Sequence, residues 1–389
     1  MIEKQAFAIW DELVSIRRAL HKIPELCFQE FQTSALIQKA LKSYGIPFQV
    51  IAKTGVAGLI TGGRPGKTIL LRADIDALPI QEESGVSYAS EHPGYMHACG
   101  HDVHTACLLG AAKILNAMKN DLPGNIKLIF QPAEEGEGGA LPMIEAGVME
   151  NPHVDAAFAL HVEPLAETGT LQFKTGSIMA SPDDFEFTVY GKGGHGGNPH
   201  KCVDPILTAA MIINNMQSVV SRNINPMTPC AVSVCAIHGG NCHNVIPDSV
   251  QVLGTARSLD PGTRKLLATQ LENVAVNTAA AMGARCAFTF SPLFPPVIND
   301  QAMTKLAADA AAELDCVREI SWLEEASMAG DDFAYFIENT PGAYFKLGVG
   351  NRNGGICEPI HSAKFQADES ALPIGAAVLA NIAYQFLNS

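Results

Sequence analysis

Apolar and polar positions follow two patterns along this chain, one typical of amphipathic helices and one typical of buried strands. Residues 5–21 and 30–44 carry apolar side chains at helical spacing, and Gly45 with Pro47 ends the second predicted helix. Three later segments are continuously apolar, as in strands buried on both faces. The pattern therefore predicts an α/β fold. The predicted strands cover residues 48–51, 58–61, 67–79, 125–130 and 154–160.

Ionisable residues follow each of the three long apolar strands. The first strand ends at Asp74 and Asp76, the second runs into Glu134 and Glu135, and the third runs into His161. Open α/β sheets bind ligands in the crevice outside the carboxyl ends of their strands. We therefore expect these side chains to meet at one edge of the sheet.

The pattern changes between Pro182 and Phe294. The predicted order there is strand, helix, strand, strand, helix, strand, which is the order of a split βαβ, ferredoxin-like α+β module. We interpret this segment as an inserted smaller domain. Its predicted elements cover residues 185–190, 204–220, 231–237, 249–257, 264–282 and 285–290.

The first pattern resumes after the insertion. A helix is predicted over residues 302–314, a strand over 343–347 and a closing helix over 372–387. A chain of 389 residues also exceeds the usual size of a single core. We predict an α/β catalytic domain formed by residues 1–181 and 295–389, with residues 182–294 inserted as a lid or dimerisation domain.

Composition and charge limit the classes of partner. The net charge is −14, from 26 basic and 40 acidic residues, and no cluster of Lys and Arg interrupts the acidic background. This argues against nucleic-acid and anionic-membrane binding. No apolar run approaches the roughly 20 residues that span a bilayer, and the N-terminal residues begin an amphipathic helix rather than a secretory signal. The ten cysteines form no CxxC pair, so we expect reduced thiols and a cytoplasmic protein.

The densest group of metal-binding side-chain types lies in residues 97–105, HACGHDVHT, which contain three histidines, a cysteine and an aspartate. Gly100 precedes a helix-compatible apolar run, so Cys99 is expected near a helix N-terminus, where the dipole favours an accessible thiolate. Thiolate with the imidazole of His101 suits Zn²⁺, Mn²⁺ or Co²⁺. A loop with a buried cysteine and hydrogen-bonded histidines is the alternative, and this stretch alone does not decide between them.

Glu134 and Glu135 are the second signal. Neighbouring residues on an irregular turn point in different directions, so one carboxylate can bind a metal while the other accepts a proton from the activated water. A solvated acidic turn that includes Glu137 would have the same local sequence.

The candidate donors together exceed what one tetrahedral ion needs. They are Cys99, His101, Glu135, His161 and His361. This surplus suggests two metals that share a water or hydroxide, and it favours hydrolysis of a carbonyl or phosphoryl compound.

Six ordered segments resemble one enzyme group. They are RADIDALP (72–79), HACGHDVHT (97–105), QPAEE (131–135), GKGGHGGNPH (191–200), NVIPD (244–248) and GTARS (254–258). The group is that of hippurate hydrolase, N-acyl-amino-acid amidohydrolases and auxin-amino-acid conjugate hydrolases, within the aminoacylase and dinuclear-zinc exopeptidase family of metallopeptidases. The resemblance runs nearly from end to end and implies a mixed-sheet, dinuclear-metal catalytic domain with a smaller lid.

The resemblance also implies roles for individual residues. The five candidate donors match the metal ligands of the group, and Glu134 matches its general base. His195 matches a lid histidine that, in dimeric relatives, reaches the neighbouring active site and polarises the scissile carbonyl. Asn244 and Arg257 resemble residues near the substrate carboxylate, although Arg257 could equally be a structural ion-pair partner.

Two positions depart from the wider family. Asp74 stands where many exopeptidases have a ligand histidine, so it is expected to support the site, and Asp331 holds the acidic position of an acidic-Asp-Phe stretch. We expect a homodimeric, metal-dependent amidohydrolase of N-acyl amino acids with two divalent ions, zinc, manganese, cobalt or nickel. The alternatives are a dipeptidase or carboxypeptidase of the same family and a non-catalytic metal or small-molecule binding protein.

Overall fold

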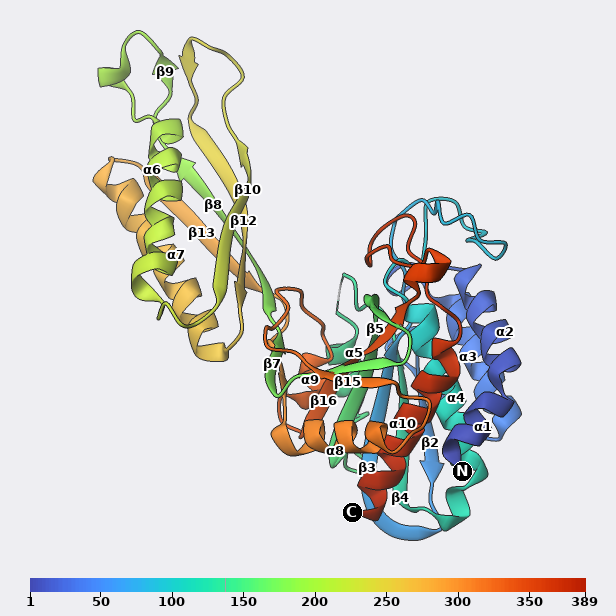
Figure 1. Ribbon diagram of the computed structural model, residues 1–389. Coiled ribbons are helices and arrows are strands. Elements are labelled where there is room, and N and C mark those ends of the chain that lie inside the picture. The colour runs from blue at the N-terminus through green and yellow to red at the C-terminus, as the bar shows by residue number, and fades with distance from the viewer. Residues whose placement is uncertain (137) are drawn as a thin grey trace. The chain divides into compact units, whose positions relative to one another are not determined.

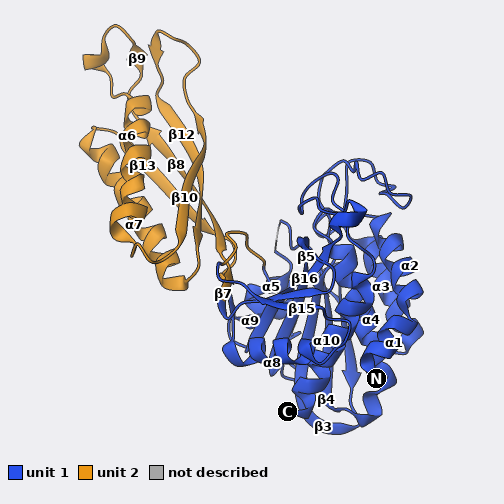
Figure 2. Ribbon diagram, viewed as in Figure 1, with its two compact units in different colours: residues 1–176, 298–325, 332–389 blue, residues 177–297, 326–331 orange. Residues whose placement is uncertain are grey.

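The computed structural model describes residues 1–136 and 138–389, so Glu137 lies outside the described residues. The chain forms two compact units (Figure 2). Unit 1 contains residues 1–176, 298–325 and 332–389, and unit 2 contains residues 177–297 and 326–331. The predicted insertion, residues 182–294, lies within unit 2.

Unit 1 is built on an eight-stranded mixed sheet of order β1-β2-β4-β3-β5-β16-β6-β15 (Figure 1). The four central strands, β4, β3, β5 and β16, are parallel to one another, and β1 and β2 pair antiparallel with their neighbours. Strand β6 pairs antiparallel with β16 and parallel with β15. This confirms the predicted mixed sheet. The strands are β1 (Phe48–Ile51), β2 (Gly55–Thr61), β3 (Arg64–Asp74), β4 (Pro123–Gln131), β5 (Ala156–Glu167), β6 (Thr170–Phe173), β15 (Glu319–Trp322) and β16 (Gly342–Gly350).

The register brings the carboxyl ends of the central strands together. Asp74 of β3 pairs with Gln131 of β4, and Arg72 of β3 pairs with Ala159 of β5, two residues before His161. Each of these strands is buried where it approaches this edge, because helices cover the sheet. Asp74 at the end of β3, Glu134 and Glu135 after β4, and His161 of β5 are therefore delivered to one edge, as the sequence predicted. The third strand was predicted to end at residue 160, but β5 continues past His161 to Glu167.

Helices α4 and α10 share one apolar core with the sheet, and α2 and α3 pack on α4 (Figure 1). The predicted helix over residues 5–21 is two helices, because the backbone leaves helical geometry at Ile9 (φ −107°, ψ 12°). The apolar spacing continues across this break, so periodicity alone showed one helix. The helices of unit 1 are α1 (Ile2–Ala8), α2 (Trp10–His21), α3 (Phe31–Tyr44), α4 (His101–Ala117), η1 (Lys119–Asp121), α5 (Ala140–Glu145), α8 (Gln301–Ala312), α9 (Ala334–Ile337), η4 (Arg352–Gly354) and α10 (Ala371–Asn388).

Helix α10 has the length and apolar composition of a membrane-spanning helix. Of its 18 residues, 83% are buried inside the protein, where they contact α4, α8 and the sheet. Its apolar composition therefore reflects its place in the core of unit 1.

Unit 2 contains a four-stranded antiparallel sheet of order β10-β12-β8-β13 with helices α6 and α7 on one face (Figure 1). Strand β8 alternates, and its Phe185, Phe187 and Val189 point into the core beneath the helices. The strand order and the two crossover helices are those of the predicted ferredoxin-like module. The elements are β8 (Ser181–Tyr190), α6 (Pro205–Ser218), η3 (Val219–Asn223), β10 (Cys230–His238), β12 (Ser249–Ser258), α7 (Pro261–Ala281) and β13 (Arg285–Pro292).

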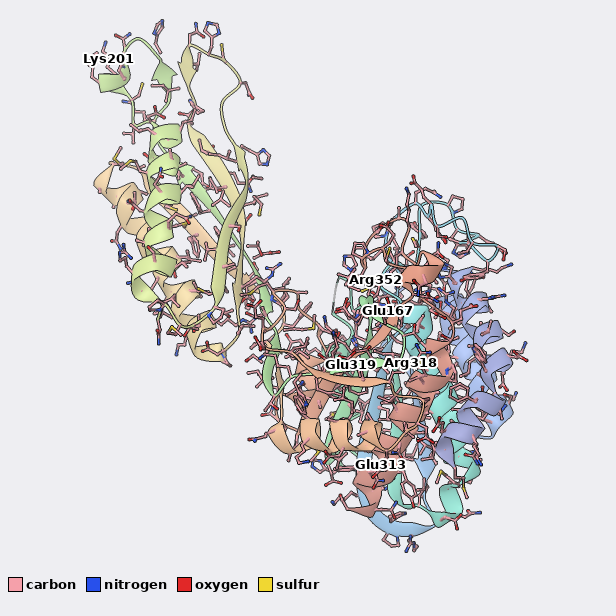
Figure 3. The ribbon with its side chains drawn as sticks, viewed as in Figure 1. Glu167, Lys201, Glu313, Arg318, Glu319 and Arg352 are labelled. Atoms are coloured by element: carbon pink, nitrogen blue, oxygen red, sulfur yellow. The ribbon has the colours of Figure 1, made fainter. Side chains whose placement is uncertain are left out.

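Two short strands form one end of unit 2. Strand β9 (Gly194–His195) pairs with β11 (Val245–Ile246), and η2 (Pro199–Lys201) follows β9. Lys201, labelled in Figure 3, marks this end. The remaining strands, β7 (Gly176–Met179) and β14 (Val297–Asn299), lie where the chain passes from one unit to the other.

Candidate metal centre and active site

The five predicted metal donors converge at the carboxyl edge of the unit 1 sheet. Cys99 Sγ lies 3.4 Å from His161 Nε2, and Glu135 Oε1 lies 3.3 Å from His361 Nε2 and 3.8 Å from His101 Nε2. The candidate metal-ligand atoms of these five residues form two groups of three. Within each group the atoms lie within 4.8 Å of one another, and both groups contain Cys99. One group adds His101 and His161, and the other adds Glu135 and His361.

A glycine allows the chain to turn between the first two donors. Gly100 is the N-cap of α4 with φ 81°, and a Cβ atom there would lie 2.6 Å from the side chain of Val162. Any other residue would be strained and would clash with β5. His361 also has a positive φ of 64°, and its N–H donates to Ala98 O at 2.8 Å. These two turns place the donors from α4 and from the C-terminal segment against the strand ends.

Two buried atoms of the donors lack hydrogen-bond partners within the described residues. They are His101 Nε2 and Glu135 Oε1. The other nitrogen of His101, Nδ1, lies 3.2 Å from Asp76 Oδ1, and His161 Nδ1–H donates to Val162 O at 2.8 Å. The Nδ1 atoms of His101 and His161 are thus held by protein acceptors, as is usual for the ring nitrogen of a metal-binding histidine that does not bind the metal. A buried polar atom without a partner is costly, so this ligand set fits a divalent cation.

Two of the candidate ligands, Cys99 and His101, hold protons when only protein groups surround them. Burial lowers the pKa of His101, but Asp74 and Asp76 outweigh it and raise that pKa to about 10. Burial, together with Glu135 and Glu134, raises the pKa of the Cys99 thiol well above its ordinary value. The expectation that the Cys99 thiol is accessible is wrong, because Cys99 is only 7% exposed. A cation must replace the protons at these donors.

Glu134 lies in the same turn as Glu135. It is buried, and ligand atoms of Glu134, Glu135 and His101 lie within 4.8 Å of one another. The N–H of Glu135 donates to Asp76 Oδ2 at 2.9 Å, so Asp76 fixes both this turn and His101. The sequence showed Asp76 at the end of a strand, but it did not indicate this double contact.

Asp74 uses both of its oxygens in hydrogen bonds. Oδ2 accepts from Arg72 Nη1 at 2.6 Å, and Oδ1 accepts from His104 Nδ1 at 2.6 Å. Burial alone would raise the pKa of Asp74, but His101, Arg72 and His104 hold it well below its usual range. His97 is also buried, and burial lowers its pKa to about 4, so this imidazole is neutral.

A second group of buried charged side chains joins α4 to α2. Asp102 Oδ2 accepts from Arg17 Nε at 2.7 Å and faces His21 Nδ1 at 2.8 Å. Arg17 and His21 lie four residues apart on the buried face of α2. This spacing, which puts two side chains on one face of a helix, was the sequence signal that could have shown that they lie together. A surface pair such as Glu167 and Arg352, labelled in Figure 3 and 3.8 Å apart, contributes far less to stability.

His195 and Asn244 come together at the β9 end of unit 2. Val245 pairs with His195, and Gly196 N–H donates to Asn244 O at 2.9 Å. Both side chains are exposed. Their juxtaposition within unit 2 was not apparent from the 49 residues that separate them in the sequence.

Arg257 lies far from this pair within unit 2. It is near the end of β12 that pairs with the start of β8, opposite Pro182. Asn244 precedes the other end of β12, about 30 Å away along a strand of this length. Arg257 donates from Nε to Met328 O at 3.2 Å and from Nη1 to Ala256 O at 3.1 Å. The structure therefore does not place Arg257 with His195 and Asn244.

Comparisons with known proteins agree along the whole chain. A model of peptidase family M20/M25/M40 matches residues 70–385. The chain is 40% identical to thermostable carboxypeptidase 2 of Saccharolobus solfataricus, over 98% of this chain and 96% of that protein. It is 41% identical to N-acetyl-L-cysteine deacetylase of Bacillus subtilis, over 97% and 89%.

A solved structure shows the same fold. The YXEP protein of Bacillus subtilis, described as a dinuclear metal binding peptidase from the M20 family, is 36% identical with a TM-score of 0.86, and the likeness covers 98% of this chain and 99% of that one. The family match spans most of the chain, and the relatives extend over nearly all of it. The protein belongs to peptidase family M20/M25/M40 and is a metal-dependent hydrolase.

Proposed function

We propose that this hydrolase cleaves the amide bond of N-acyl amino acids. The observation that carries the proposal is the group of Cys99, His101 and Glu135, in which His101 Nε2 and Glu135 Oε1 are buried without hydrogen-bond partners among the described residues, with Glu134 alongside. The similarity to a deacetylase of an N-acetyl amino acid supports this substrate class. Benzoyl-glycine and indole-acetyl amino acids are the acyl types that the sequence motifs suggested.

Two divalent ions fit the donors. Cys99, His101 and His161 would hold one, and Cys99, Glu135 and His361 would hold the other, since Cys99 belongs to both groups. Zinc, manganese, cobalt and nickel all accept such a mixed set of sulfur, nitrogen and oxygen donors. When bound, the two ions supply Lewis-acid polarisation of the scissile carbonyl and an activated water.

The residues of this chain supply the proton transfers and the polar contacts. Glu134 takes a proton from the attacking water as the new C–O bond forms, and it delivers that proton to the leaving amine nitrogen as the C–N bond breaks. Its buried position keeps bulk water from competing for this proton. His195 donates a hydrogen bond to the carbonyl oxygen as negative charge develops there. Asn244, beside His195, contacts the substrate carboxylate.

A homodimer is part of the proposal. Helix α6 exposes Ile206, Leu207 and Met211 by 44%, 52% and 42%, and β10 is an edge strand of the unit 2 sheet, paired on one side with β12. Apolar helix faces and open edges of this kind favour association with another chain. In such a dimer, His195 and Asn244 of one subunit serve the metal centre of its partner. The described part of the chain contains no disulfide among its ten cysteines, which supports a reducing, cytoplasmic location.

A carboxypeptidase is the second candidate, because one relative of 40% identity carries that name. The two activities differ in the group on the carbonyl side of the scissile bond, which is a simple acyl group in one and a peptide in the other. The acidic turn and donor set serve either reaction, so substrate preference must decide between them.

The experiment starts from chelated protein that receives Mn²⁺, Zn²⁺, Co²⁺ or Ni²⁺. Turnover is measured with N-acetyl-cysteine, benzoyl-glycine, indole-acetyl amino acids, dipeptides and blocked peptides. We expect metal-restored hydrolysis of the acyl amino acids at higher kcat/KM than the peptides. Faster peptide cleavage would establish the carboxypeptidase or dipeptidase alternative. If no compound is hydrolysed with any of the metals, the remaining alternative is a non-catalytic binding protein.

A further inference from the structure

Glu30 is a fully buried carboxylate outside the metal centre. It is the N-cap residue of α3, yet its side chain does not cap that helix. Oε1 accepts from the N–H of Phe28 at 2.9 Å and from the N–H of Ala133 at 3.0 Å. Oε2 accepts from Thr54 Oγ1 at 2.6 Å. One carboxylate therefore joins three segments that are far apart in the sequence.

All three segments contain left-handed backbone at residues other than glycine. Phe28 has φ 56°, Ala133 has φ 56°, and Lys53, next to Thr54, has φ 70°. Such residues are strained and persist only where neighbouring groups hold them. Glu30 accepts hydrogen bonds directly from two of these residues, Phe28 and Ala133. It also accepts one from the side chain of Thr54, which follows Lys53.

Ala133 directly precedes Glu134 and Glu135. The left-handed turn at Ala133 determines the direction in which both carboxylates leave β4. From the other side, Asp76 holds the N–H of Glu135 at 2.9 Å. The turn is thus held at both ends by buried carboxylates, Glu30 before Glu134 and Asp76 after it.

We propose that Glu30 is a positioning residue that holds Ala133 in its left-handed conformation and thereby aims Glu134 and Glu135 at the metal centre. This inference rests on the proposed roles of those two glutamates. Glu30 itself touches neither the candidate ligands nor the place of the substrate. Its effect reaches the reaction only through the turn.

Three variants of Glu30 test the inference. Glu30→Ala removes all three contacts, and Glu30→Asp, one methylene shorter, keeps the charge but cannot span them. Glu30→Gln keeps every contact, because its oxygen accepts both N–H groups and its amide donates to Thr54 Oγ1. We expect Ala and Asp to weaken metal affinity and to lower kcat by about 10–100-fold, with KM little changed. Gln should retain wild-type values.

Glu25 provides a matched control on the same segment. It is buried, and its carboxylate accepts from the N–H groups of Gln32 and Thr33 at 3.1 and 2.9 Å, in the first turn of α3. Its side chain is bound to α3 and not to the turn at Ala133. Glu25→Ala should lower the melting temperature without changing metal affinity or kcat. Equal losses in Glu25→Ala and Glu30→Ala would show a merely structural role and overturn the proposal.

A glycine at position 133 supplies the decisive readout. Glycine adopts a positive φ without steric cost, so Ala133→Gly should restore part of the metal affinity and kcat in the Glu30→Ala background. No restoration, or wild-type values in Glu30→Ala and Glu30→Asp, would overturn the proposal. Metal affinity is measured by titrating chelated protein with Mn²⁺ in a calorimeter. This comparison tests Glu30 even if the wild type hydrolyses no acyl amino acid, an outcome that would instead contradict the proposed function.

Discussion

His104 joins the end of β3 to β5 through Asp74. Its Nε2 accepts the backbone N–H of Val162 at 2.9 Å, so the proton of the neutral ring is on Nδ1, which donates to Asp74 Oδ1 at 2.6 Å. Both ring nitrogens are used, and His104 is not available to a metal despite its place among the donors. It instead fixes the position of Asp74 relative to the strand that carries His161.

Replacing His104 should therefore destabilise the protein more than a typical surface change. His104→Ala leaves a buried carboxylate and a buried N–H without their partner, at a cost of about 3 kcal/mol. Urea unfolding of chelated wild type and variant measures the difference. His153→Ala, at an exposed histidine, is the control and should change stability by less than about 0.5 kcal/mol. A loss of stability below about 1 kcal/mol in His104→Ala would show that the hydrogen bonds of His104 to Asp74 and Val162 do not stabilise the protein appreciably.

Glu134→Gln should abolish turnover while preserving metal content. The amide matches the carboxylate in shape but cannot accept the proton of water, and loss of a general base costs about 10²–10⁴-fold in rate. Metal analysis and kcat on the best substrate of the panel are the two measurements. Glu145→Gln, at an exposed glutamate that ends α5, should leave both unchanged. Undiminished turnover in Glu134→Gln would remove Glu134 from the mechanism.

Metal binding should release protons, and metal affinity should rise with pH. The raised pKa values of Cys99 and His101, the latter about 10, mean that both donors are protonated at neutral pH before the cation binds. A lower pH strengthens this competition and a higher pH relieves it, with up to about two protons lost per protein. Calorimetric titration in buffers of different ionisation enthalpy counts these protons. Cys99→Ala should release about one fewer, and buffer-independent heats would contradict the linkage.

His21 should stabilise the protein more at low pH than at high pH. Burial lowers its pKa, but the contacts with Asp102 and Glu82 outweigh burial and raise the pKa above the ordinary 6.5. The folded protein thus binds this proton more tightly than the unfolded chain. The contribution is complete below about pH 6.5 and is lost as the pH rises through the raised folded value. Unfolding of chelated wild type and His21→Gln should differ more at about pH 6 than at about pH 9, and a constant difference would contradict the assignment.

The strands and their chemistry could be predicted because both signals are local. Continuous apolar runs identified β3, β4 and β5, and the ionisable residues after each run identified the edge at which they meet. Cys99 and His101 were found for the same reason, since they lie two residues apart. The sheet order and the mixed pairing of β6 needed the structure, because short strands with few buried residues leave little periodicity.

The supporting residues could not be predicted, because their partners lie far away in the sequence. Asp102 bonds Arg17 across 85 residues, and Glu30 bonds Ala133 across 103. No local pattern encodes such pairs. The protonated state of Cys99 was missed for a related reason, since burial and the carboxylate of Glu135 are properties of the folded site.

Mixing two inactive variants should restore activity if His195 acts on a neighbouring subunit. His195→Ala lacks the oxyanion contact, and Glu134→Gln lacks the base. In a dimer with one chain of each kind, the chain that keeps Glu134 receives His195 from its partner, so one of the two sites is complete. Random exchange makes half of the dimers mixed, and the mixture should regain about a quarter of wild-type activity. If His195 serves its own chain, each site lacks one residue and the mixture stays inactive. Sedimentation velocity on the same samples confirms that dimers are present, so an inactive dimeric mixture would exclude the action of His195 across subunits.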